Sequence, residues 1–440
     1  MLFEVQCSYL DVRMRLAVRL VLRCSSLLAA GTLLVAAQNA PLTVEDCIRM
    51  ALEAKSALSV ARNDLRAAQH GVVGARAGFL PQAQATAGYT YNSPSKLGDG
   101  SPQFIALNGV REYSTQLGLS MPVDISGRLR AELARARSER EAARYNVRLT
   151  ERDLKRSVVA AYYRLVLARR LVVVAQSTLA EARSFEERTR KLNAAGEAAR
   201  ADLVKAQAAT SFQRQALQAA EADAATANHE LAAFWTEDVA TLLNVADPFD
   251  AALTAPPAEA SADAYLARPE FNVFEAERTG MRADVSKARA DMLPQASVNW
   301  QYGIDSQRYS WADRGQALYL SMNVPVFDWL RAWSGMKQAQ LKLDSFDVSH
   351  AIERRNLSRD YQSALAKVRS AWSQIDTTRE QVSFSEEDLR LARVRYEGGE
   401  GLALDVVASQ TQLAQARGNY YSAIAAYFNA QADFEVASGK

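Results

Sequence analysis

Histidine, cysteine and carboxylate side chains most often carry out catalysis or bind metals. In this sequence they do not form a motif at the spacing of an active site or a metal site. His70, His229 and His350 lie far apart, each in a predicted helix and without further ligands at metal-binding spacing. The stretch YEGGEG at 396–401 follows no predicted strand, so it does not match a nucleotide-binding loop. We therefore predict no catalytic residues, no metal site, no cofactor, and a protein that is not an enzyme.

Charge and composition exclude one further class of function and indicate the fold class. The chain carries 52 Lys and Arg against 50 Asp and Glu, a formal net charge of +2. Such a balance gives no electrostatic footprint for nucleic acid, so we predict no nucleic-acid partner. Alanine, arginine, glutamine and glutamate dominate, and these residues favour long helices.

The N-terminal segment has the pattern of an export signal. Arg15, Arg19 and Arg23 precede an apolar run at 27–37 that ends in small residues. This order predicts a secretory signal peptide over residues 1–37, with Met14 as an alternative start. A transmembrane anchor is the alternative, but about a dozen apolar residues cannot cross a bilayer of roughly 30 Å as a helix.

The chain repeats one plan twice. ARAGFLPQA at 75–83 returns as ARADMLPQA at 288–296, and KLNAAGEAARADLVKAQ returns as RVRYEGGEGLALDVVASQ, with Gly196 matching Gly399. A repeat at this distance indicates two copies of one structural unit. We predict a signal peptide at 1–37, a first repeat at 38–247 with a β-hairpin at 82–122, a connector at 248–263, and a second repeat at 264–440 with a β-hairpin at 295–325.

Leu-Pro stands at the centre of the repeated phrase. Proline has no N–H to donate and pushes the preceding residue into an extended conformation, so it ends a helix. Pro81 and Pro294 are therefore predicted helix–strand corners. Pro122 and Pro325 are predicted to mark the corners where the chain leaves each hairpin.

Alternation with a period of two predicts four strands of about ten residues, the length of a tilted membrane strand. One face is apolar and aromatic, and the other is small and polar. The predicted lipid-facing residues are Tyr89, Tyr91, Val298, Trp300 and Tyr302. The aromatic residues among them are typical of a membrane interface. Two soluble hairpins packed on helices remain the alternative.

Each hairpin precedes a very long helical segment. Neither glycine nor proline occurs between Gly127 and Gly196, or between Gly335 and Gly398. Helices of this length need partner helices, so we predict a coiled-coil-like sheaf. Gly196, Gly398 and Gly399 fall where each long helix must turn back, and glycine supplies the positive φ of such a turn.

Three stretches together resemble the outer-membrane efflux proteins, the TolC-like family of channels. They are LTVEDCIRMALEAKSALSVARNDLRAAQHGVVGARAGFLPQAQATAGYTY, LSMNVPVFDWLRAWSGMKQAQ, and RVRYEGGEGLALDVVASQTQLAQAR. The resemblance covers residues 42–434. It implies a mainly α fold with a membrane β part, in which duplicated long-helix hairpins form a trimeric α-barrel and four strands per chain join a shared 12-stranded β-barrel.

The resemblance also implies roles at the helix turns. It makes Gly196, Gly398 and Gly399 the tips that dock a periplasmic adaptor, and it places Tyr396 and Asp405 at a periplasmic gate. This chain departs from the family pattern, because Ala408 replaces a second aspartate and Gly401 replaces a basic residue. An acid at Asp405 could equally serve the N-terminal turn of a helix.

The predicted function is an outer-membrane exit channel of a tripartite efflux or type I secretion system, forming a passive water-filled duct. The number of strands also predicts a homotrimer. Four strands cannot close a barrel, and a barrel of eight strands has no open interior, whereas the twelve strands of three copies form a barrel with an open interior. The implied partners are outer-membrane lipid, a periplasmic adaptor protein and an inner-membrane pump. The predicted location is the bacterial outer membrane, extending into the periplasm. A soluble periplasmic coiled-coil adaptor or structural protein is the alternative.

Overall fold

The computed structural model describes residues 41–93, 110–256, 261, 263–328 and 330–439. The predicted signal peptide at 1–37 lies outside these residues, as do most residues of the loop in the first hairpin. Within the described ranges, no helix combines the length and the apolar character needed to cross a bilayer.

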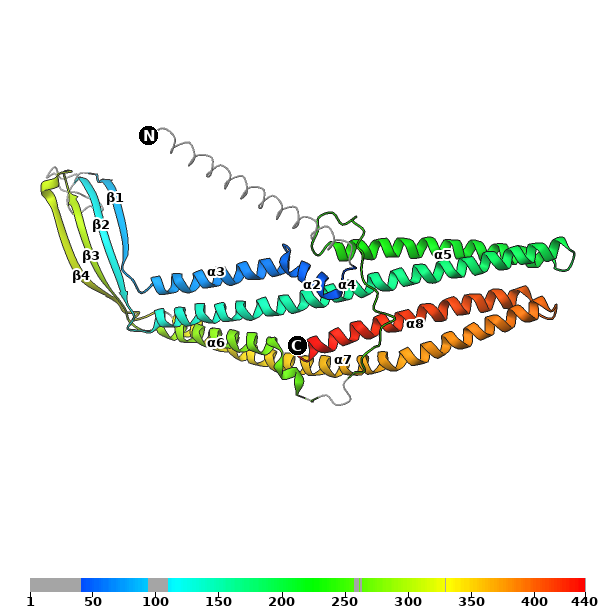
Figure 1. The fold of residues 1–440 in the computed structure, drawn as a ribbon. Helices are drawn as coiled ribbons and strands as arrows, with labels where there is room; N and C mark the ends of the chain where they lie inside the picture. The colour runs from blue at the N-terminus through cyan, green and yellow to red at the C-terminus, as the bar shows by residue number, and fades with distance from the viewer. Residues whose placement is uncertain (1–40, 94–109, 257–260, 262, 329, 440) are drawn as a thin grey trace, which may run out of the picture. The chain divides into compact units, whose positions relative to one another are not determined.

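The two copies share the order of one helix, two strands and two further helices, with a short helix ahead of them (Figure 1). The first contains α2 (Val44–Glu53), α3 (Ala57–Ala77), β1 (Gln82–Tyr91), β2 (Arg111–Val123), α4 (Arg128–Ala194) and α5 (Arg200–Ala232). The second contains η1 (Ala264–Ala267), α6 (Pro269–Ala290), β3 (Gln295–Ser306), η2 (Trp311–Asp313), β4 (Arg314–Asn323), α7 (Arg331–Glu397) and α8 (Ala403–Ala437). The boundaries at 38–247, 248–263 and 264–440 stay predictions.

The four strands form one antiparallel sheet in the order β1-β2-β3-β4. Ala85 pairs with Leu117, Leu117 with Tyr302, and Trp300 with Leu318. Because residues in register share a face, the alternation in all four strands adds up to one apolar and one polar face. The pairing of β2 with β3 joins the first copy to the second.

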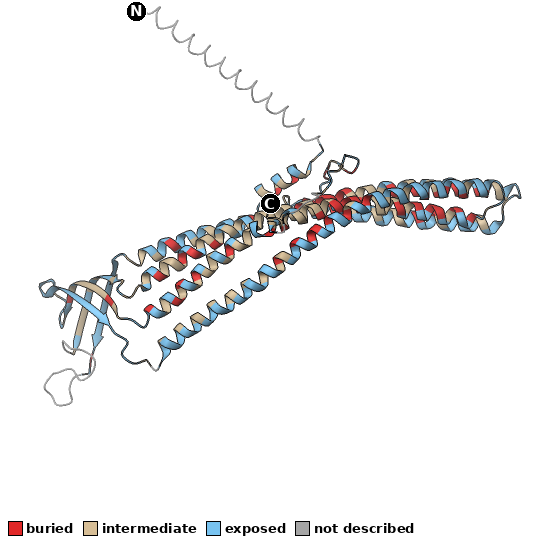
Figure 2. Cartoon of the chain, turned by 90° about the horizontal axis from the view of Figure 1, so that it is seen from below, coloured by how far each residue is buried: buried red, intermediate tan, exposed pale blue. Residues whose placement is uncertain are grey.

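The chain packs as two compact units that cut across the repeats. One unit comprises the described residues of Met1–Ser56, Lys155–Pro257 and Lys367–Ala432, and the other those of Ala57–Leu154, Ala258–Ala366 and Asp433–Lys440. The first unit is referred to as the tip unit, since it contains both helix turns, and the second as the sheet unit. In the helices of both units, buried positions recur along one side, as in amphipathic packing (Figure 2).

Each unit has its own apolar core. In the tip unit, Phe185, Leu389, Tyr396, Val406 and Leu413 belong to one buried cluster. In the sheet unit, the corresponding cluster contains Tyr265, Leu357, Tyr361 and Ala437. The C-terminal end of α8 thus closes the core of the sheet unit, whereas the rest of α8 belongs to the tip unit.

Among the described residues of the tip unit, one thiol is buried. Cys47 on α2 is a free cysteine with no exposed surface. Burial raises the pKa of its thiol to about 12. A thiol with such a pKa is almost entirely protonated at neutral pH and is therefore a poor nucleophile.

Candidate functional site

Both helix–strand corners are closed by the same glutamine. The Gln82 amide donates to the carbonyls of Ala77 (2.8 Å) and Leu80 (3.1 Å). The Gln295 amide donates to the carbonyls of Ala290 (2.9 Å) and Leu293 (3.1 Å). The last carbonyls of a helix lack intrahelical donors, and this side chain donates to the last carbonyl of the helix and to a second carbonyl three residues beyond it. The repeated phrase thus contains a C-terminal cap directly after its proline.

The prolines lie close to the predicted corners. Pro81 and Pro294 immediately precede β1 and β3. Pro122 is the penultimate residue of β2, opposite Ser297, and Pro325 follows the end of β4 by two residues. Their roles as corners stay predictions.

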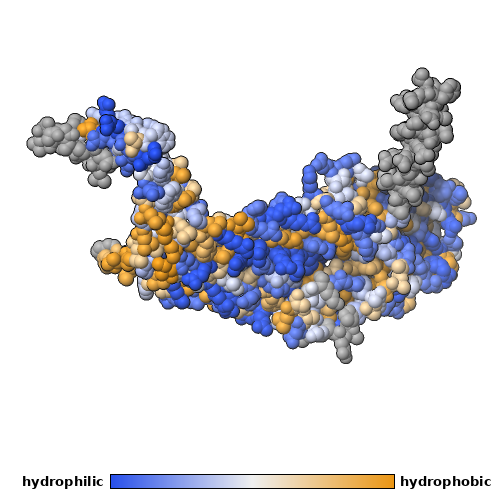
Figure 3. All heavy atoms as spheres, turned by 60° about the vertical axis from the view of Figure 1, so that its left-hand side comes forward, coloured by the Kyte–Doolittle hydropathy of each residue, from blue (hydrophilic) through white to orange (hydrophobic). Residues whose placement is uncertain are grey.

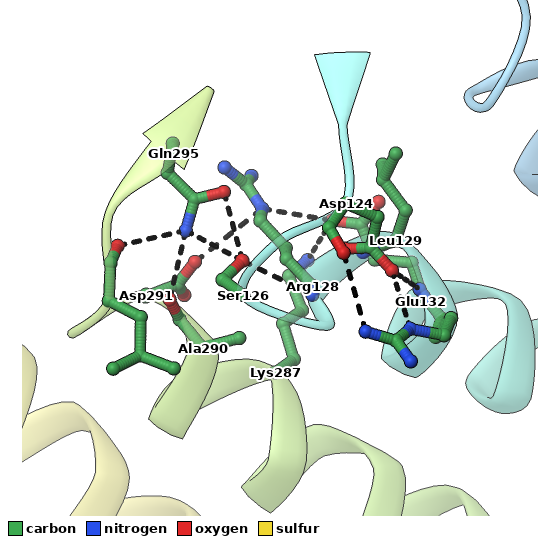
Figure 4. A network of polar contacts seen from close by, with 11 residues as sticks. Asp124, Ser126, Arg128, Leu129, Glu132, Lys287, Ala290, Asp291 and Gln295 are labelled. Atoms are coloured by element: carbon green, nitrogen blue, oxygen red, sulfur yellow. Dashed lines mark hydrogen bonds and ion pairs between the residues drawn. The ribbon is translucent and has the colours of Figure 1, made fainter. Parts of the chain in front are cut away.

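A polar network fixes the corner between β2 and α4 (Figure 4). The Asp124 carboxylate accepts from the backbone N–H of Leu129 (3.0 Å) and of Arg130 (3.2 Å), and from Arg130 Nε (2.9 Å). It therefore satisfies free donors in the first turn of α4, where the helix dipole favours negative charge. Asp124 was not among the predicted site residues, although an acid before a helix start is a recognisable signal.

The same network ties α4 to α6 and to β3 within the sheet unit. The Gln295 amide also donates to Ser126 Oγ at 3.0 Å. Lys287 Nζ lies 3.0 Å from the Glu132 carboxylate, and Arg128 Nε lies 3.5 Å from Asp291. Exposed ion pairs of this kind contribute little stability, so we read the network as fixing the direction in which the strands leave the helices.

The corner between β4 and α7 is built differently. The Asp328 carboxylate accepts from the backbone N–H of Ala332 at 2.7 Å, which caps the first turn of α7. Leu330, directly before α7, has a φ of 63°, and Gly127, directly before α4, has a φ of 82°. The second copy therefore places a leucine where the first uses glycine.

The sheet has one apolar and one polar face. Leu117, Leu119, Leu318 and Leu320 are exposed on the apolar face, and hydrophobic residues gather on the part of the sheet nearest the helices (Figure 3). The predicted lipid-facing residues share this face: Tyr89 and Tyr91 on β1, and Val298, Trp300 and Tyr302 on β3. The rings of Trp300 and Tyr302 stack with centroids 6.2 Å apart. Their contact with lipid stays a prediction.

The opposite face is a ladder of uncharged polar side chains in its central part. Ser120 Oγ donates to Asn299 Oδ1 at 2.7 Å, and Asn299 Nδ2 donates to Ser321 Oγ at 2.9 Å. Ser297 and Ser321 share a hydrogen bond of 2.7 Å. Gln301 Nε2 donates to the Tyr319 hydroxyl at 3.2 Å. These groups hydrogen-bond across the strands and would also bind water.

The two helix turns use glycine as the sequence predicts. Gly196 and Gly399 have φ values of 84° and 78°, whereas no positive φ occurs at Gly398. In the first turn, Asn193 Nδ2 donates to the Ala198 carbonyl at 2.8 Å. In the second, a Cβ built on Gly401 would lie 2.9 Å from the backbone nitrogen of Tyr396, so glycine fits a close approach there.

The two predicted gate residues have different surroundings in one chain. Asp405 is exposed, and its carboxylate accepts from the backbone N–H of Leu402 at 3.3 Å, as an acid in the first turn of α8. Tyr396 is 8% exposed, with its ring 5.2 Å from that of Phe185 and its hydroxyl 3.4 Å from Thr189 Oγ1. The gate itself stays a prediction.

The three histidines are dispersed. His70 and His229 are exposed on helices, and the His350 ring lies 4.9 Å from that of Phe274. Among the described residues, no three His, Cys, Asp or Glu side chains form a set that could hold a metal ion.

A largely buried ion cluster in the sheet unit was not predicted from the sequence. Arg152 on α4 makes two hydrogen bonds of 3.0 Å to the Glu270 carboxylate, and Arg268 Nη2 makes a third at 2.5 Å. Burial alone would raise the pKa of Glu270, but the bonds from Arg268 and Arg152 lower it to about 2. The cluster holds the first turn of α6 against α4.

Comparisons with known proteins agree with this arrangement. A family model described as outer membrane efflux protein matches residues 47–237 and 261–440. The chain is 22% identical over 393 residues to the cobalt-zinc-cadmium resistance protein CzcC of Cupriavidus metallidurans, covering 89% of this chain and 88% of that protein.

Solved channel structures share the fold. The CmeC outer membrane channel of Campylobacter jejuni matches with a TM-score of 0.81 at 17% identity, covering 90% of this chain and 85% of that one. The open state of the MtrE outer membrane channel of Neisseria gonorrhoeae matches with a TM-score of 0.76 at 23% identity, covering 90% and 88%.

Long duplicated helices joined to a two-faced antiparallel sheet define an outer-membrane channel subunit. The chain belongs to the outer membrane efflux protein family, whose model matches most of its length. The predicted fold class is confirmed: the fold is that of trimeric TolC-like channels, in which the sheet of each chain contributes to a shared barrel. The protein is an exit channel of the outer membrane that extends into the periplasm, and its family consists of channel proteins.

Proposed function

We propose that three copies of this chain close a twelve-stranded barrel and serve as the passive duct of a tripartite efflux or type I secretion system. The observation that supports this proposal most directly is the order of the strands in the sheet, which leaves one side of β1 and one side of β4 unpaired. Unpaired strand edges are not tolerated in lipid, so β4 of one copy must pair with β1 of another. Twelve strands are the smallest multiple of four with an open interior.

Exposed apolar side chains on two helices support the same association. Leu341, Val348 and Ile352 are exposed along α7, which follows β4. Val60 and Val73 are exposed on α3, which precedes β1. The three α7 residues form an apolar row at helical spacing, which is typical of a helix that packs against a partner helix, whereas Val60 and Val73 lie on different sides of α3. Pairing β4 with β1 of the next copy would bring α7 beside α3 of that copy.

The polar face of the sheet suits the lumen of such a duct. Its Ser, Asn and Gln side chains are uncharged and would line the passage with hydrogen-bonding groups, which hold water and discriminate weakly among solutes. A passage of this kind supplies neither energy nor much selectivity. We therefore assign both to an inner-membrane pump.

The helix turns are the proposed contact with the periplasmic adaptor that joins the duct to the pump. Gly196, Gly398 and Gly399 are exposed, as are Glu197 and Glu400 beside them. We propose that three copies of Asp405 narrow the same end of the duct, with Tyr396 supporting the turn from within. An exposed ring of carboxylates would attract cations to the constriction.

Opposite faces of β3 provide the test of the duct. Val298 lies on the apolar face and Gln301 on the polar face. Val298→Arg places a cation toward lipid, at a cost of about 2–4 kcal/mol near the bilayer midplane, and should prevent trimers from reaching the outer-membrane fraction. Gln301→Arg points into water and should still yield detergent-stable trimers. Equal assembly of both variants would refute the proposed orientation of the sheet.

A further inference from the structure

The chain between the end of β4 and the first turn of α7 exposes an unusual amount of apolar surface. Val324 is 48% exposed, Val326 90%, Leu330 67% and Trp333 50%. We call these four residues the β4–α7 patch. All of them lie in the sheet unit. The duct described above does not account for them, because they lie outside β4 and near the start of α7.

The patch continues a row that begins on the sheet. Leu318, Leu320 and Met322 alternate along β4 and are 73%, 66% and 57% exposed. Val324 and Val326 follow at the same spacing of two. Pro325 favours an extended conformation at Val324, and alternate residues of an extended chain share a face, so we infer that this apolar row continues past the end of the strand. The surface is therefore continuous with the face that we assign to lipid.

The backbone of Leu330 supports a use for its side chain. Its φ of 63° lies in the left-handed region. Residues other than Gly, Asn and Asp adopt this backbone conformation only with steric strain. Gly127 occupies the corresponding position before α4 with a φ of 82° and avoids this strain. A leucine kept in an unfavourable backbone conformation, and pointing into solvent in one chain, indicates an apolar partner.

We propose that the β4–α7 patch anchors the chain in the interfacial region of the membrane leaflet that borders the periplasm. The occupant is phospholipid: acyl chains contact Val326 and Leu330, and the Trp333 indole lies at the level of the headgroups. Arg331, exposed between them, can reach lipid phosphate. The continuity with the outer face of β4 favours lipid over a second copy, whose proposed contacts are the strand edge and the α7 row that begins at Leu341. The inference rests on the proposed function.

Spin labels on single cysteines give a direct test in the full-length trimer reconstituted in phospholipid vesicles. Cys47 is fully buried, and Cys7 and Cys24 lie in the predicted signal peptide, so the processed chain without a substitution serves as the unlabelled control. The variants are Val326→Cys and Leu330→Cys, with Leu320→Cys as the reference for lipid and Ala317→Cys, on the polar face, as the reference for water. The readout is the ratio of collision rates with oxygen, which dissolves in lipid, and with a nickel chelate, which stays in water.

We expect the ratio at Val326 and Leu330 to fall between the two references, clearly above Ala317 and below Leu320. A ratio equal to that of Ala317 would overturn the anchor and leave the patch in water. Low collision rates with both reagents would also overturn it, because they mean contact with a second copy. A water-like ratio at Leu320 itself would instead contradict the membrane sheet and thus the proposed function.

A matched pair of substitutions tests whether the leucine side chain matters to the anchor. Leu330→Asn tolerates a positive φ but removes the apolar side chain, and Leu330→Met keeps the apolar character. We expect the Asn variant to raise the collision rate of the nickel chelate with a label at Val326→Cys, and the Met variant to leave it unchanged. Equal collision rates of the nickel chelate in the two variants would show that the Leu330 side chain is not part of the anchor.

Discussion

The turn between α4 and α5 and the turn between α7 and α8 share a backbone and differ in what stabilises it. Gly196 and Gly399 occupy corresponding positions, with φ values of 84° and 78°. Three residues before each glycine stands Asn193 in the first copy and Tyr396 in the second. Asn193 closes its own turn by a hydrogen bond of 2.8 Å to Ala198, whereas Tyr396 is buried against Phe185 of α4.

This difference separates conformation from stability. The glycine fixes the path of the chain in both turns, because it adopts a left-handed φ without steric strain. Both turns contact a core shared by α4, α5, α7 and α8, but the first does so through the partly buried Leu192, whereas the second places the buried Tyr396 inside it. Opening the second turn therefore loses more apolar packing than opening the first.

The largest expected effect comes from exchanging these two anchors for alanine. Tyr396→Ala empties a buried site and should lower the stability of the second turn by about 3–5 kcal/mol. Asn193→Ala removes one hydrogen bond and should cost about 1 kcal/mol. Hydrogen exchange of the backbone amides in each turn measures both. Tyr396→Phe is the control and should stay within about 1 kcal/mol of the parent, since its hydroxyl bond is long. Similar losses of stability in Tyr396→Ala and Asn193→Ala would contradict the difference that we infer between the two turns.

A second contrast between the copies lies at the start of the helix before each hairpin. Glu270 in α6 is bound by Arg152 and Arg268, and the corresponding residue in α3 is Ala57. Glu270→Gln leaves two guanidinium groups without their carboxylate. We expect a loss of about 2–3 kcal/mol at neutral pH, below the range for fully buried pairs because the cluster is partly exposed.

The pH dependence gives a separate check on Glu270. Its pKa falls from 4.5 to about 2 on folding, so its contribution is fully present above about pH 4.5 and is lost as the pH drops toward 2. The parent chain should lose stability over this window in denaturant titrations of the folded trimer. The Gln variant should lose less over the same window. If the stability of the parent chain and that of Glu270→Gln changed in parallel with pH, the cluster would not contribute to stability.

The glycines should behave alike in the two turns, which sharpens the comparison. Gly196→Ala and Gly399→Ala each force a side chain into a left-handed conformation and should each cost about 1–2 kcal/mol. Gly398→Ala, at an ordinary φ, is the control and should change stability by less than about 1 kcal/mol. Thermal denaturation of the purified trimers would rank the three variants. A much smaller loss for Gly196 would mean that the first turn can rebuild its backbone.

The smallest structural effect, and the most direct functional one, concerns the two acids after the turns. Asp405 caps the first turn of α8, so Asp405→Ala should cost about 0.3–1 kcal/mol. It should also weaken cation selectivity in single-channel recordings, since three carboxylates would leave the proposed constriction. Asp202 is the equivalent acid, and Lys205 follows it closely, so Asp202→Ala should change selectivity less. Unchanged selectivity in Asp405→Ala would leave that residue its capping role alone.

Much of the fold follows from local patterns in the sequence. Alternation gives the four strands, and the glycine spacing gives the two turns, because both signals act over a few residues. The length of β3 differs from expectation: the alternation predicts strands of about ten residues, but β3 has 12 and runs to Ser306 because Asp305 and Ser306 still pair with β2. Hydrogen bonding to a neighbouring strand extends an element beyond its own pattern.

The interactions around the site were less accessible to sequence reasoning. The bond between Arg152 and Glu270 joins residues 118 positions apart, and no local signal specifies such a pair. The burial of Tyr396 depends on its distance from Phe185, which the motif does not contain. The Gln82 and Gln295 caps were different, since both residues lie inside the repeated phrase. Their role could have been found by asking which side chain satisfies the carbonyls at each helix end.

These glutamine caps also bear on the order in which the molecule folds. Each cap joins residues only two to five positions apart, and each hairpin pairs strands that are close in the chain. In contrast, the bond between Ser120 and Asn299 spans 179 positions. Because contacts between distant residues carry a higher entropic cost of loop closure, they form more slowly. We expect the two corners and their hairpins to form first in the exported chain, with β2 and β3 joining afterwards as the step that readies a subunit for its neighbours.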